Sequence, residues 1–343
     1  MDIELLPGDE WPAMEVADCE FPRLNSHQQG WLQAVCRGLS HRPYLLVHRS
    51  DRGEVDGLLP LAFVKSLLFG RFLTSMPYLN TGGVWAADPQ VASALIDRGC
   101  RLADELNTRY LELRHEHRVE HPKLNAERTD KVHMRLPLPA SDDELNSSFK
   151  SKLRSQIRKS GDFGLSLEWG SENLLADFYH VFSINMRDLG TPVYSRRLFA
   201  EILKAFPEEA ELCVVRQEGR PIAGALLTHL NQISEVPSAS CLRKFNRTNA
   251  NMWMYRNLLR RAIERGSQCF DFGRSSRDSG TYKFKAQWGA QPHPAIWQYY
   301  VRKGSPEDMR PDAGGKQKLV ELWKKLPVPI SRLLGPHIVR GIP

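Results

Sequence analysis

The sequence predicts an α/β (α+β) protein with two similar domains, each a mixed sheet flanked by helices. Segments that alternate apolar and polar residues take turns with segments of helical periodicity. One order of elements, namely hairpin, strand, loop, helix and strand, occurs twice, about 165 residues apart. The chain has 343 residues, 41% of them apolar, which is enough for two hydrophobic cores.

The first copy of this order fills the N-terminal part of the chain. Its expected elements are strands at 43–48, 55–64, 72–75 and 83–85, a helix from about residue 89, and a strand at 110–114. The helix places Val91, Leu95 and Leu102 on one face, so it should cover a sheet. We expect this first domain to span residues 1–139.

The second copy follows the same plan. Its expected elements are strands at 212–216, 222–229 and 233–240, a helix from about residue 249, and a strand at 269–272. Helices at 172–188 and 195–206 should precede them. We expect this second domain at 140–303 and a C-terminal tail at 304–343.

A basic helix should connect the two copies at 144–160. Ser141 and Glu144 form a capping-box pattern before it, and Gly161 ends it. Its charged stripe includes Arg154 and Arg158. Such a stripe usually faces solvent, and the alternative is that these two arginines contact phosphate or RNA.

The tail contains a second basic amphipathic segment at 316–325, followed by a Pro-rich end. Leu319, Leu322 and Trp323 should face one way. The helix either packs on its own domain or makes a peripheral contact with a membrane surface or a partner.

Charge and cysteine content indicate the kind of partner and the cellular compartment of the protein. Lys and Arg number 47 against 40 Asp and Glu, a net charge of +7, which favours an anionic partner such as nucleic acid, a nucleotide-linked substrate or a membrane surface. The six cysteines are scattered without a C-x-x-C pair, as in a reduced compartment. The N-terminus has no signal-peptide pattern, and the apolar stretch at 58–69 is interrupted by Lys65. We therefore expect a cytoplasmic protein.

Several kinds of site are not indicated. The chain has no Gly-x-Ser-x-Gly elbow and no P-loop motif. His115, His117 and His121 lie near Glu112, but no second ligand pair follows at a recognised spacing. We expect a solvated polar loop there and no metal site.

The strongest candidate site begins where the strand at 269–272 ends. The chain reads FDFGRS at 270–275 and GTYKFKAQWG at 280–289. A strand that opens into a loop of Gly, Ser and Arg is a usual place for a ligand in an α/β protein, although a solvated loop is the alternative.

These two segments resemble the signature of FemAB-type peptidyltransferases, and most closely that of the FemAB-like proteins associated with the exosortase/PEP-CTERM system. The loop PYLNTGG at 77–83 and the basic helix KLRSQIRK at 152–159 are also similar to that family. The resemblance implies two tandem GNAT-like (N-acyltransferase-like) domains. It also implies an enzyme that moves an aminoacyl group from aminoacyl-tRNA to an amine on a peptidoglycan precursor.

The resemblance also implies roles for single residues. Lys285 would stand beside the reacting carbonyl and stabilise the oxyanion. Lys283, on another face of the same helix, would not. The residues implied to bind substrate are Arg274 and Tyr282 in the second copy and Tyr78, Asn80, Gly82, Gly83 and Arg114 in the first, with Arg114 gripping an anionic acceptor.

The donor is less defined. A GNAT enzyme that uses acyl-CoA would carry an Arg/Gln-x-x-Gly-x-Gly/Ala loop, and the stretches at 80–84 and 243–249 do not fit it. We expect no tightly bound cofactor, with aminoacyl-tRNA as the donor, or acyl-CoA held by a divergent loop. The acceptor would be an anionic, lipid- or nucleotide-linked amine of a cell-wall or exopolysaccharide precursor. The third alternative is a non-catalytic protein that binds RNA or polysaccharide.

Overall fold

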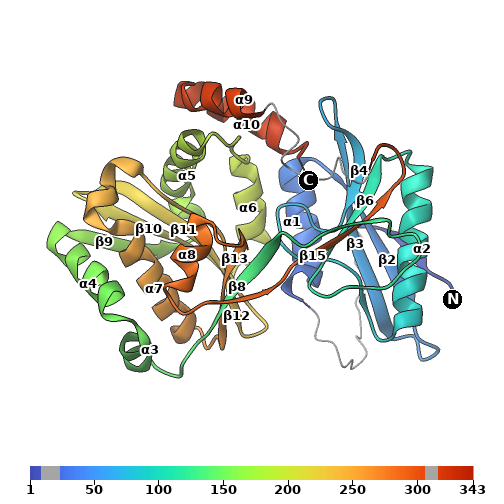
Figure 1. Ribbon diagram of the computed structural model, residues 1–343, viewed down its shortest axis with the longest axis horizontal. Helices are drawn as coiled ribbons and strands as arrows, with labels where there is room; N and C mark the ends of the chain where they lie inside the picture. Colours follow the sequence, from blue (N-terminus) through green and yellow to red (C-terminus); the bar gives the residue numbers. More distant parts are fainter. Residues whose placement is uncertain (9–23, 306–315, 343) are drawn as a thin grey trace. The chain divides into compact units, whose positions relative to one another are not determined.

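The computed structural model describes residues 1–8, 24–305 and 316–342 of the chain (Figure 1). It divides into two compact units. The first comprises Met1–Lys131, Pro294–Gly314 and His337–Pro343, and the second comprises Val132–His293 and Gly315–Pro336.

The first unit is an eight-stranded mixed sheet in the order β1-β2-β3-β4-β6-β15-β7, with β5 paired to β3. β4 and β6 run parallel, with Leu73 opposite Leu111. The strands are β1 (Glu4–Pro7), β2 (Arg42–Arg49), β3 (Val55–Ser66), β4 (Gly70–Thr74), β5 (Trp85–Ala86), β6 (Tyr110–His115), β7 (Ala126–Arg128) and β15 (Ile296–Val301). The helices are α1 (Gln29–Leu39) and α2 (Pro89–Glu105), with a 3-10 turn, η1 (Asn25–His27), before α1.

α2 forms where the sequence predicts it. The Asp88 carboxylate accepts hydrogen bonds from the N–H groups of Gln90 and Val91, and Pro89 occupies the first turn, where it has no N–H to leave unpaired. The helix lies very close to β3, because a Cβ atom at Gly57 would lie 2.4 Å from Val91 Cγ1. The apolar face of α2 thus forms the core of this unit with β3 and β6.

The second unit is a seven-stranded sheet in the order β14-β8-β13-β12-β11-β10-β9. β12 and β13 run parallel, with Ile233 opposite Cys269. The strands are β8 (Lys131–Pro137), β9 (Leu165–Gly170), β10 (Ala210–Gln217), β11 (Arg220–Leu230), β12 (Ile233–Cys241), β13 (Cys269–Ser276) and β14 (Gln291–Pro294). The helices are α3 (Asp142–Ser148), α4 (Ser151–Ser160), α5 (Leu175–Leu189), α6 (Arg196–Ala205), α7 (Ala250–Glu264), α8 (Gly280–Ala286), α9 (Lys316–Lys324) and α10 (Val328–Val339), with 3-10 turns η2 (Gly161–Phe163), η3 (Glu172–Leu174) and η4 (Arg243–Thr248).

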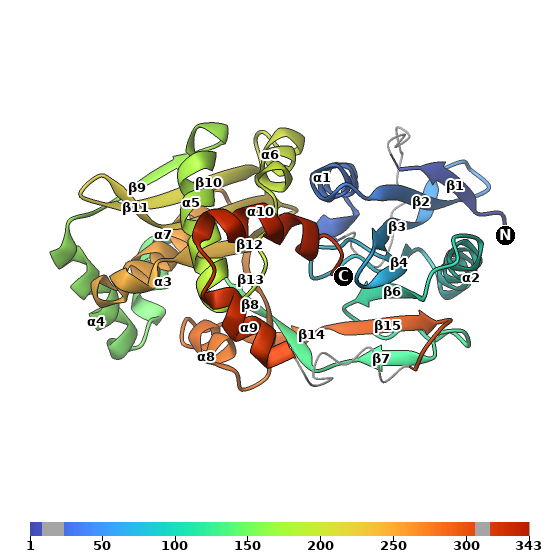
Figure 2. The ribbon, with the colours of Figure 1, turned by 90° about the horizontal axis from the view of Figure 1, so that it is seen from above.

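Apart from β5, the strand orders of the two sheets correspond one to one. In each sheet a helix joins two parallel neighbouring strands, α2 in the first and α7 in the second. One position in each sheet is filled from the other half of the sequence. β15, which follows the second copy, lies between β6 and β7 (Figure 2), and β8, which precedes the second copy, lies between β13 and β14. The units therefore divide the chain differently from the boundaries expected at residues 139 and 303.

The connector expected as one helix over 144–160 is two helices. Ser141 Oγ does accept the N–H of Glu144, as the capping pattern indicates. The helix then ends because Phe149 has an extended backbone, with ψ of 139°, and the next helix begins at Ser151. The break lets Phe149 reach the core, where its ring lies 5.4 Å from that of Trp288.

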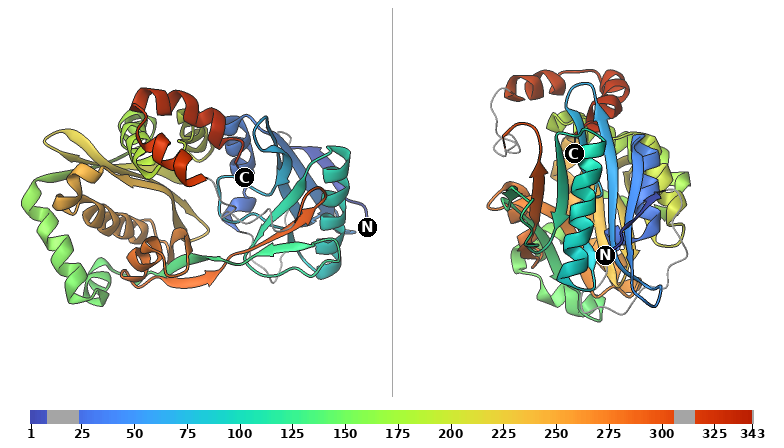
Figure 3. Two further views of the ribbon diagram at one scale, coloured as in Figure 1. Left: turned by 45° about the horizontal axis from the view of Figure 1, so that its top comes forward. Right: turned by 90° about the vertical axis from the view of Figure 1, so that its right-hand side faces the viewer.

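The C-terminal tail forms two helices rather than one helix and an irregular end. α9 matches the expected segment, whereas the prolines argue against α10. Pro329 falls in the first turn of α10, where a missing N–H is harmless, and only Pro336 lies inside the helix. Figure 3 shows α9 beside α5.

The structure also bears on the expectations about membrane-spanning segments and cysteines. No helix among residues 1–8, 24–305 and 316–342 combines the length and apolar character that crossing a bilayer requires. Five cysteines are free thiols in this part of the chain, and Cys19 lies outside the described residues.

Candidate active site

Lys285 lies near the end of α8 and turns its side chain back onto β13. Ser279 caps the helix, since its hydroxyl accepts the N–H of Tyr282 at 3.1 Å. The side chain of Lys285 is buried, with the residue only 8% exposed. Its Nζ atom donates hydrogen bonds to the carbonyl oxygens of Gly273, at 3.0 Å, and Arg274, at 3.1 Å. The segments FDFGRS and GTYKFKAQWG, which we call the motif, thus meet at the ammonium group of Lys285.

The backbone of β13 explains why the carbonyls face Lys285. The parallel pairing of β13 with β12 ends at Asp271, opposite Glu235. Gly273 then adopts a φ of 76°, a conformation that residues with a Cβ atom rarely take. The strand was expected to end at residue 272, but it continues to Ser276 beyond this glycine.

The aromatic residues of the motif hold α8 in place. The Phe272 ring stacks on that of Tyr255, with centroids 5.7 Å apart, and Phe284 meets Tyr255 edge-on at 5.0 Å. Trp288 is fully buried and packs edge-on against Phe149. These rings belong to the core of the second unit, so the position of Lys285 depends on packed side chains rather than on a mobile loop.

The electrostatics of Lys285 combine burial and one carboxylate. Burial lowers the pKa of Lys285 to about 8, and the nearby Asp271 carboxylate opposes this by raising it. Asp271 is itself fixed, because it accepts the N–H of Gly273 at 2.6 Å and pairs with Arg135 Nε at 2.8 Å. At neutral pH Lys285 is therefore protonated in most molecules, and it loses that proton more easily than an exposed lysine does.

This arrangement leaves Lys285 one free hydrogen-bond donor. An ammonium group has three N–H bonds. Gly273 and Arg274 take two of them, and no other hydrogen bond of Nζ is formed within the part of the chain that the structure describes. The third can donate to an oxygen atom that becomes negative during a reaction.

Three further residues of the same two segments, Tyr282, Arg274 and Ser275, belong to the candidate site. Tyr282 lies three residues before it on α8 and so shares its face of the helix, and Arg274 provides one of the two carbonyls. Both are partly exposed. Sequence reasoning missed Ser275, whose hydroxyl is buried and has no hydrogen-bond partner among the described residues. Its place in FDFGRS was the available signal.

Arg114, expected to grip an anionic acceptor, is buried within the first unit, at 3% exposure. Its Nε atom pairs with Glu112 at 2.8 Å, and Nη1 donates to the carbonyls of Met76 and Leu79. Its guanidinium also lies 4.1 Å from the centre of the Trp297 ring. These contacts hold the loop at 77–83 in place, and Nη2 has no hydrogen-bond partner among the described residues. The expected grip of Arg114 on an anionic acceptor stays a prediction.

The loop at 77–83 is under backbone strain. Tyr78 has a φ of 75° although it carries a side chain, and the loop continues through Gly82 at 147°. The N–H groups of Gly82 and Gly83 both donate to the Arg114 carbonyl, so they serve the loop itself. A Cβ atom at Gly83 would lie 1.9 Å from the His115 ring. Tyr78 and Asn80 are the partly exposed members of the expected set, whereas both glycines serve packing.

His115, the last residue of β6, behaves as a structural residue and is buried rather than part of a solvated loop. His115 Nε2 accepts the N–H of Val84 at 3.0 Å, and Nδ1 lies 2.9 Å from Gln298 Oε1. Because Nε2 accepts, the proton of the neutral ring is on Nδ1 and is donated to Gln298. Burial lowers the pKa of His115 to about 3, which keeps the ring neutral. Within the described residues no three His, Cys, Asp or Glu side chains group as metal ligands would.

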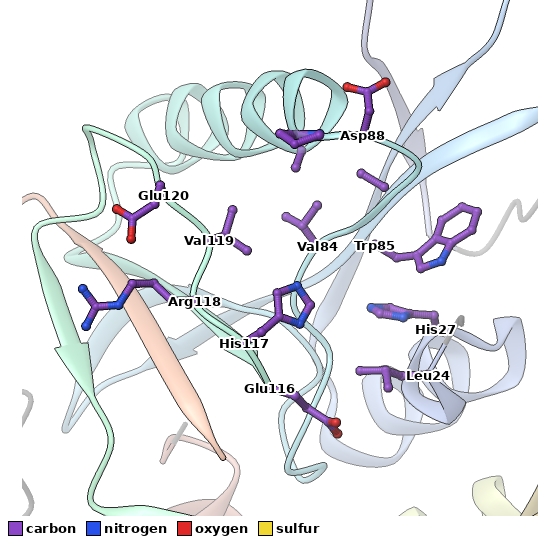
Figure 4. Close-up of a pocket in the computed structure, with 13 residues that line it drawn as sticks. Leu24, His27, Val84, Trp85, Asp88, Glu116, His117, Arg118, Val119 and Glu120 are labelled. Carbon is purple, nitrogen blue, oxygen red and sulfur yellow. The ribbon is translucent and has the colours of Figure 1, made fainter. Parts of the chain in front are cut away.

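A pocket of about 470 Å³ lies in the first unit beside the start of α2 (Figure 4). Leu24, Val84 and Val119 give it an apolar wall, and the rings of His27 and His117 extend into it. Sequence reasoning did not identify it, because its lining comes from three separated segments.

The basic stripe is not joined to Lys285. Arg154 and Arg158 are exposed on α4, and Arg154 Nη1 donates to the Phe149 carbonyl at 2.8 Å. Figures 1 and 2 show α4 at the end of the second unit, apart from α8.

The segment at 243–249, where a coenzyme A loop would lie, folds as η4. Asn249 has a φ of 53°, and its N–H donates to the Asn246 carbonyl. The N–H of Ala250 donates to the Thr248 hydroxyl at 3.2 Å. These amides at the start of α7 are thus already bonded within the chain.

Comparison with known proteins supports the same architecture. Residues 147–286, from the end of α3 to the end of α8, match the model of a family described as "Acetyltransferase (GNAT) domain". This stretch contains Lys285 and covers less than half of the chain. No curated protein matches the sequence.

Several solved structures are similar to the chain. The crystal structure of FemX superposes with a TM-score of 0.62 at 16% identity, over 88% of this chain and 98% of that chain. A C-terminal domain assigned to a lysylphosphatidylglycerol synthetase of Agrobacterium fabrum gives 0.53 at 12% identity, over 85% and 90%. L-PGS from Bacillus licheniformis gives 0.53 at 13%, over 89% and 92%. The likeness is one of fold, and it confirms the expected fold class of two tandem GNAT-like domains, with a FemAB-like GNAT fold.

Proposed function

We propose that this chain transfers an acyl or aminoacyl group to an amine, with Lys285 as the group that stabilises the oxyanion. The observation that supports this most is the buried ammonium group with one N–H left to donate. It lies on the stretch that matches the acetyltransferase domain model. A lysine with no chemical task would be expected to extend into solvent rather than accept the cost of burial.

The proposed reaction follows ordinary aminolysis. The amine nitrogen attacks the carbonyl carbon of the donor ester or thioester, a C–N bond forms, and the π electrons of the carbonyl move to its oxygen. Lys285 donates its third N–H to this oxyanion. The oxyanion then re-forms the carbonyl and expels the donor's oxygen or sulfur, which takes up the proton that the amine gives up.

We propose aminoacyl-tRNA as the donor, with no tightly bound cofactor. The amides of Asn249 and Ala250 at the start of α7 are bonded to Asn246 and Thr248, which argues against their use in a phosphate cradle of the coenzyme A kind. The net charge of +7 favours an anionic donor such as tRNA. Acyl-CoA is the alternative donor.

For the acceptor we propose an anionic, lipid- or nucleotide-linked amine of a cell-wall or exopolysaccharide precursor in the cytoplasm. The resemblance to FemAB-like proteins of the exosortase/PEP-CTERM system implies such an acceptor. The similar fold of FemX and of a lysylphosphatidylglycerol synthetase, which by its name makes an aminoacylated lipid, is compatible with it. We propose that Arg274 and Tyr282 of the second unit orient the ester or a phosphate, and that Tyr78 and Asn80 belong to a substrate-binding loop of the first unit.

One experiment tests donor and acceptor together. The purified chain is offered charged tRNA and acyl-CoA in parallel, with a panel of amines, and the products are analysed by mass. We expect an amide product with charged tRNA that is lost in Lys285→Met. Product from acyl-CoA alone would overturn the assigned donor, and product formed equally by Lys285→Met would overturn the role of Lys285.

A second candidate function rests on a different observation. The exposed Arg154 and Arg158 on α4 are compatible with a protein that binds RNA or polysaccharide without catalysis. Charge reversal at both positions separates the two. If it abolishes all ligand binding and no transfer product is ever formed, the binding function holds and the transferase does not.

A further inference from the structure

The exposed apolar side chains of the second unit gather on one part of it. Among the described residues of this unit, every large apolar side chain that is exposed belongs to α9, α10 or the adjacent end of α5. They are Leu189, Leu319, Leu322, Ile330, Leu333 and Leu334. A cluster of this kind on a water-soluble unit marks a surface that contacts something other than water.

α9 is fixed to the unit by its inner face. Val320 packs so closely on the end of α5 that a Cβ atom at Gly190 would lie 2.5 Å from Val320 Cγ1. Arg187 Nη1 donates to the Leu326 carbonyl at 2.9 Å. Leu319 and Leu322 project from the opposite face, 66% and 62% exposed. Leu319 and Leu322 are therefore exposed even though α9 is packed against its own unit.

α10 repeats this arrangement. Arg332 Nε donates to Ser183 Oγ at 2.7 Å, and a Cβ atom at Gly335 would lie 2.8 Å from the Val193 nitrogen. Leu333 is 69% exposed, and Ile330 and Leu334, four residues apart, share one face. We call the outward side chains Leu319, Leu322, Ile330, Leu333 and Leu334 the α9–α10 face.

Basic residues flank Leu322 of this face. From Lys316 to the end of the chain the sequence has six Lys or Arg and one acidic residue, Glu321. Lys318 and Lys325 lie one turn to either side of Leu322, and the three residues line one shallow hollow with Glu321. Lysines beside leucines suit a bilayer surface, because the leucines enter the acyl region while the lysines reach the headgroups.

We propose that the α9–α10 face binds the surface of a bilayer that contains anionic lipids. The charge decides between occupants, because a second copy of this chain would bring the same basic residues against one another, whereas an anionic leaflet attracts them. Such binding would place the protein at a lipid surface whatever reaction it performs, and so it goes beyond the proposed transfer.

The test uses the full chain and vesicle sedimentation. Vesicles of phosphatidylcholine alone are compared with vesicles that also contain phosphatidylglycerol. We expect at least tenfold stronger binding to the anionic vesicles, weakening as salt rises. The variant Leu319→Ser/Leu322→Ser/Leu333→Ser should lose at least tenfold of that affinity while its circular dichroism and unfolding midpoint stay unchanged.

Two matched controls locate the contact. Leu67→Ser/Leu68→Ser removes leucines that are 103% and 71% exposed in the first unit, and it should bind as the wild type does. Lys318→Gln/Lys325→Gln should weaken binding several-fold, whereas Lys152→Gln/Lys159→Gln, on α4, should not. Lys285→Met should bind vesicles normally, so a failed transfer reaction and a failed membrane contact are distinguishable.

Three results would overturn the proposal. The wild type could stay in solution with anionic vesicles, or the triple-serine variant could bind as well as the wild type. The third is concentration-dependent self-association that the triple-serine variant abolishes in the absence of any vesicle binding, which would make the face an interface between copies.

Discussion

The ammonium group of Lys285 donates to the carbonyl oxygen of Gly273, twelve residues earlier in the chain, at a distance of 3.0 Å. The contact joins the segments FDFGRS and GTYKFKAQWG, through the glycine within β13 and the lysine near the end of α8. Because a backbone carbonyl is neutral, it orients the ammonium group without cancelling its charge. The charge remains available to a substrate.

Replacing Lys285 by Met should lower kcat about 10²–10³-fold, because one electrostatic contact to the oxyanion is lost. KM should change little if the contact forms only in the transition state. Lys283→Met is the matched control, since Lys283 is exposed on the same helix, and it should stay within about twofold of the wild type. Equal losses in both variants would show that the helix, and not the ammonium group, matters.

Activity should fall as the pH rises through about 8, the lowered pKa of Lys285, because the neutral amine no longer stabilises an oxyanion. A pH–rate profile of kcat measures this directly. A general-base role for Lys285 would give the opposite limb, with activity rising through the same range.

The same lowered pKa has a consequence for stability with a definite sign. Between pH 8 and pH 10.5 the unfolded chain keeps the proton on Lys285 that the folded chain has released, so this group makes the folded state more stable as the pH rises. Relative to Lys285→Met, the wild type should gain on the order of 2 kcal/mol between pH 7 and pH 10. Urea unfolding of both proteins at several pH values measures the difference, and a flat difference would place the lysine in solvent.

Asp271→Asn should move the falling limb of the pH–rate profile to lower pH. The Asp271 carboxylate raises the pKa of Lys285 against the effect of burial, and the amide removes that charge while its oxygen can still accept the N–H of Gly273. Glu168→Asn, which removes an exposed carboxylate paired with Arg216, should leave the profile in place.

Arg114→Met should destabilise the first unit by about 3–5 kcal/mol, because it leaves the buried Glu112 carboxylate without its cation. Burial alone would raise the pKa of Glu112, and Arg114 is the main influence that keeps it below its usual value. The exposed Arg118 pairs with Glu127, and Arg118→Met should cost less than about 1 kcal/mol. Urea midpoints compare the two, and similar small costs would contradict the structural role of Arg114.

Gly83→Ala should destabilise the first unit by about 1–3 kcal/mol, since the new Cβ atom would overlap the His115 ring. Gly161→Ala adds the same atom where no heavy atom lies within 4 Å, and it should leave stability unchanged or slightly raised. Thermal unfolding distinguishes them. An unaffected Gly83→Ala protein would mean that the loop can move away from His115.

Local patterns in the sequence were sufficient for most of the elements and for the duplicated plan. The helix from Pro89 has both its cap and its apolar stripe within one segment, so nothing distant was needed to predict it. Phe149 shows the limit of such patterns. Its spacing from Leu153 fits one continuous helix, yet the helix breaks there because the ring packs on Trp288, far along the chain.

In the candidate site, too, the sequence identified residues but not all of their contacts. The sequence singled out Lys285 and Gly273 through the motif, but their hydrogen bond depends on the φ of Gly273 and on the rings that hold α8. A strand-end arginine such as Arg114 looks the same in sequence whether it faces a ligand or a buried glutamate. The pairing of Arg114 with Glu112 is visible only in the three-dimensional packing.

The exchange of β8 and β15 also governs when each half of the protein can be finished during synthesis. The first sheet lacks a strand between β6 and β7 until residues 296–301 have left the ribosome, although its other strands are complete some 170 residues sooner. Until then β6 and β7 of the nascent first half lack the strand that pairs with both of them, and their facing edges have unpaired backbone groups. Separating the two halves, by gene splitting or by proteolysis between them, would therefore leave each with a missing strand and a surplus one.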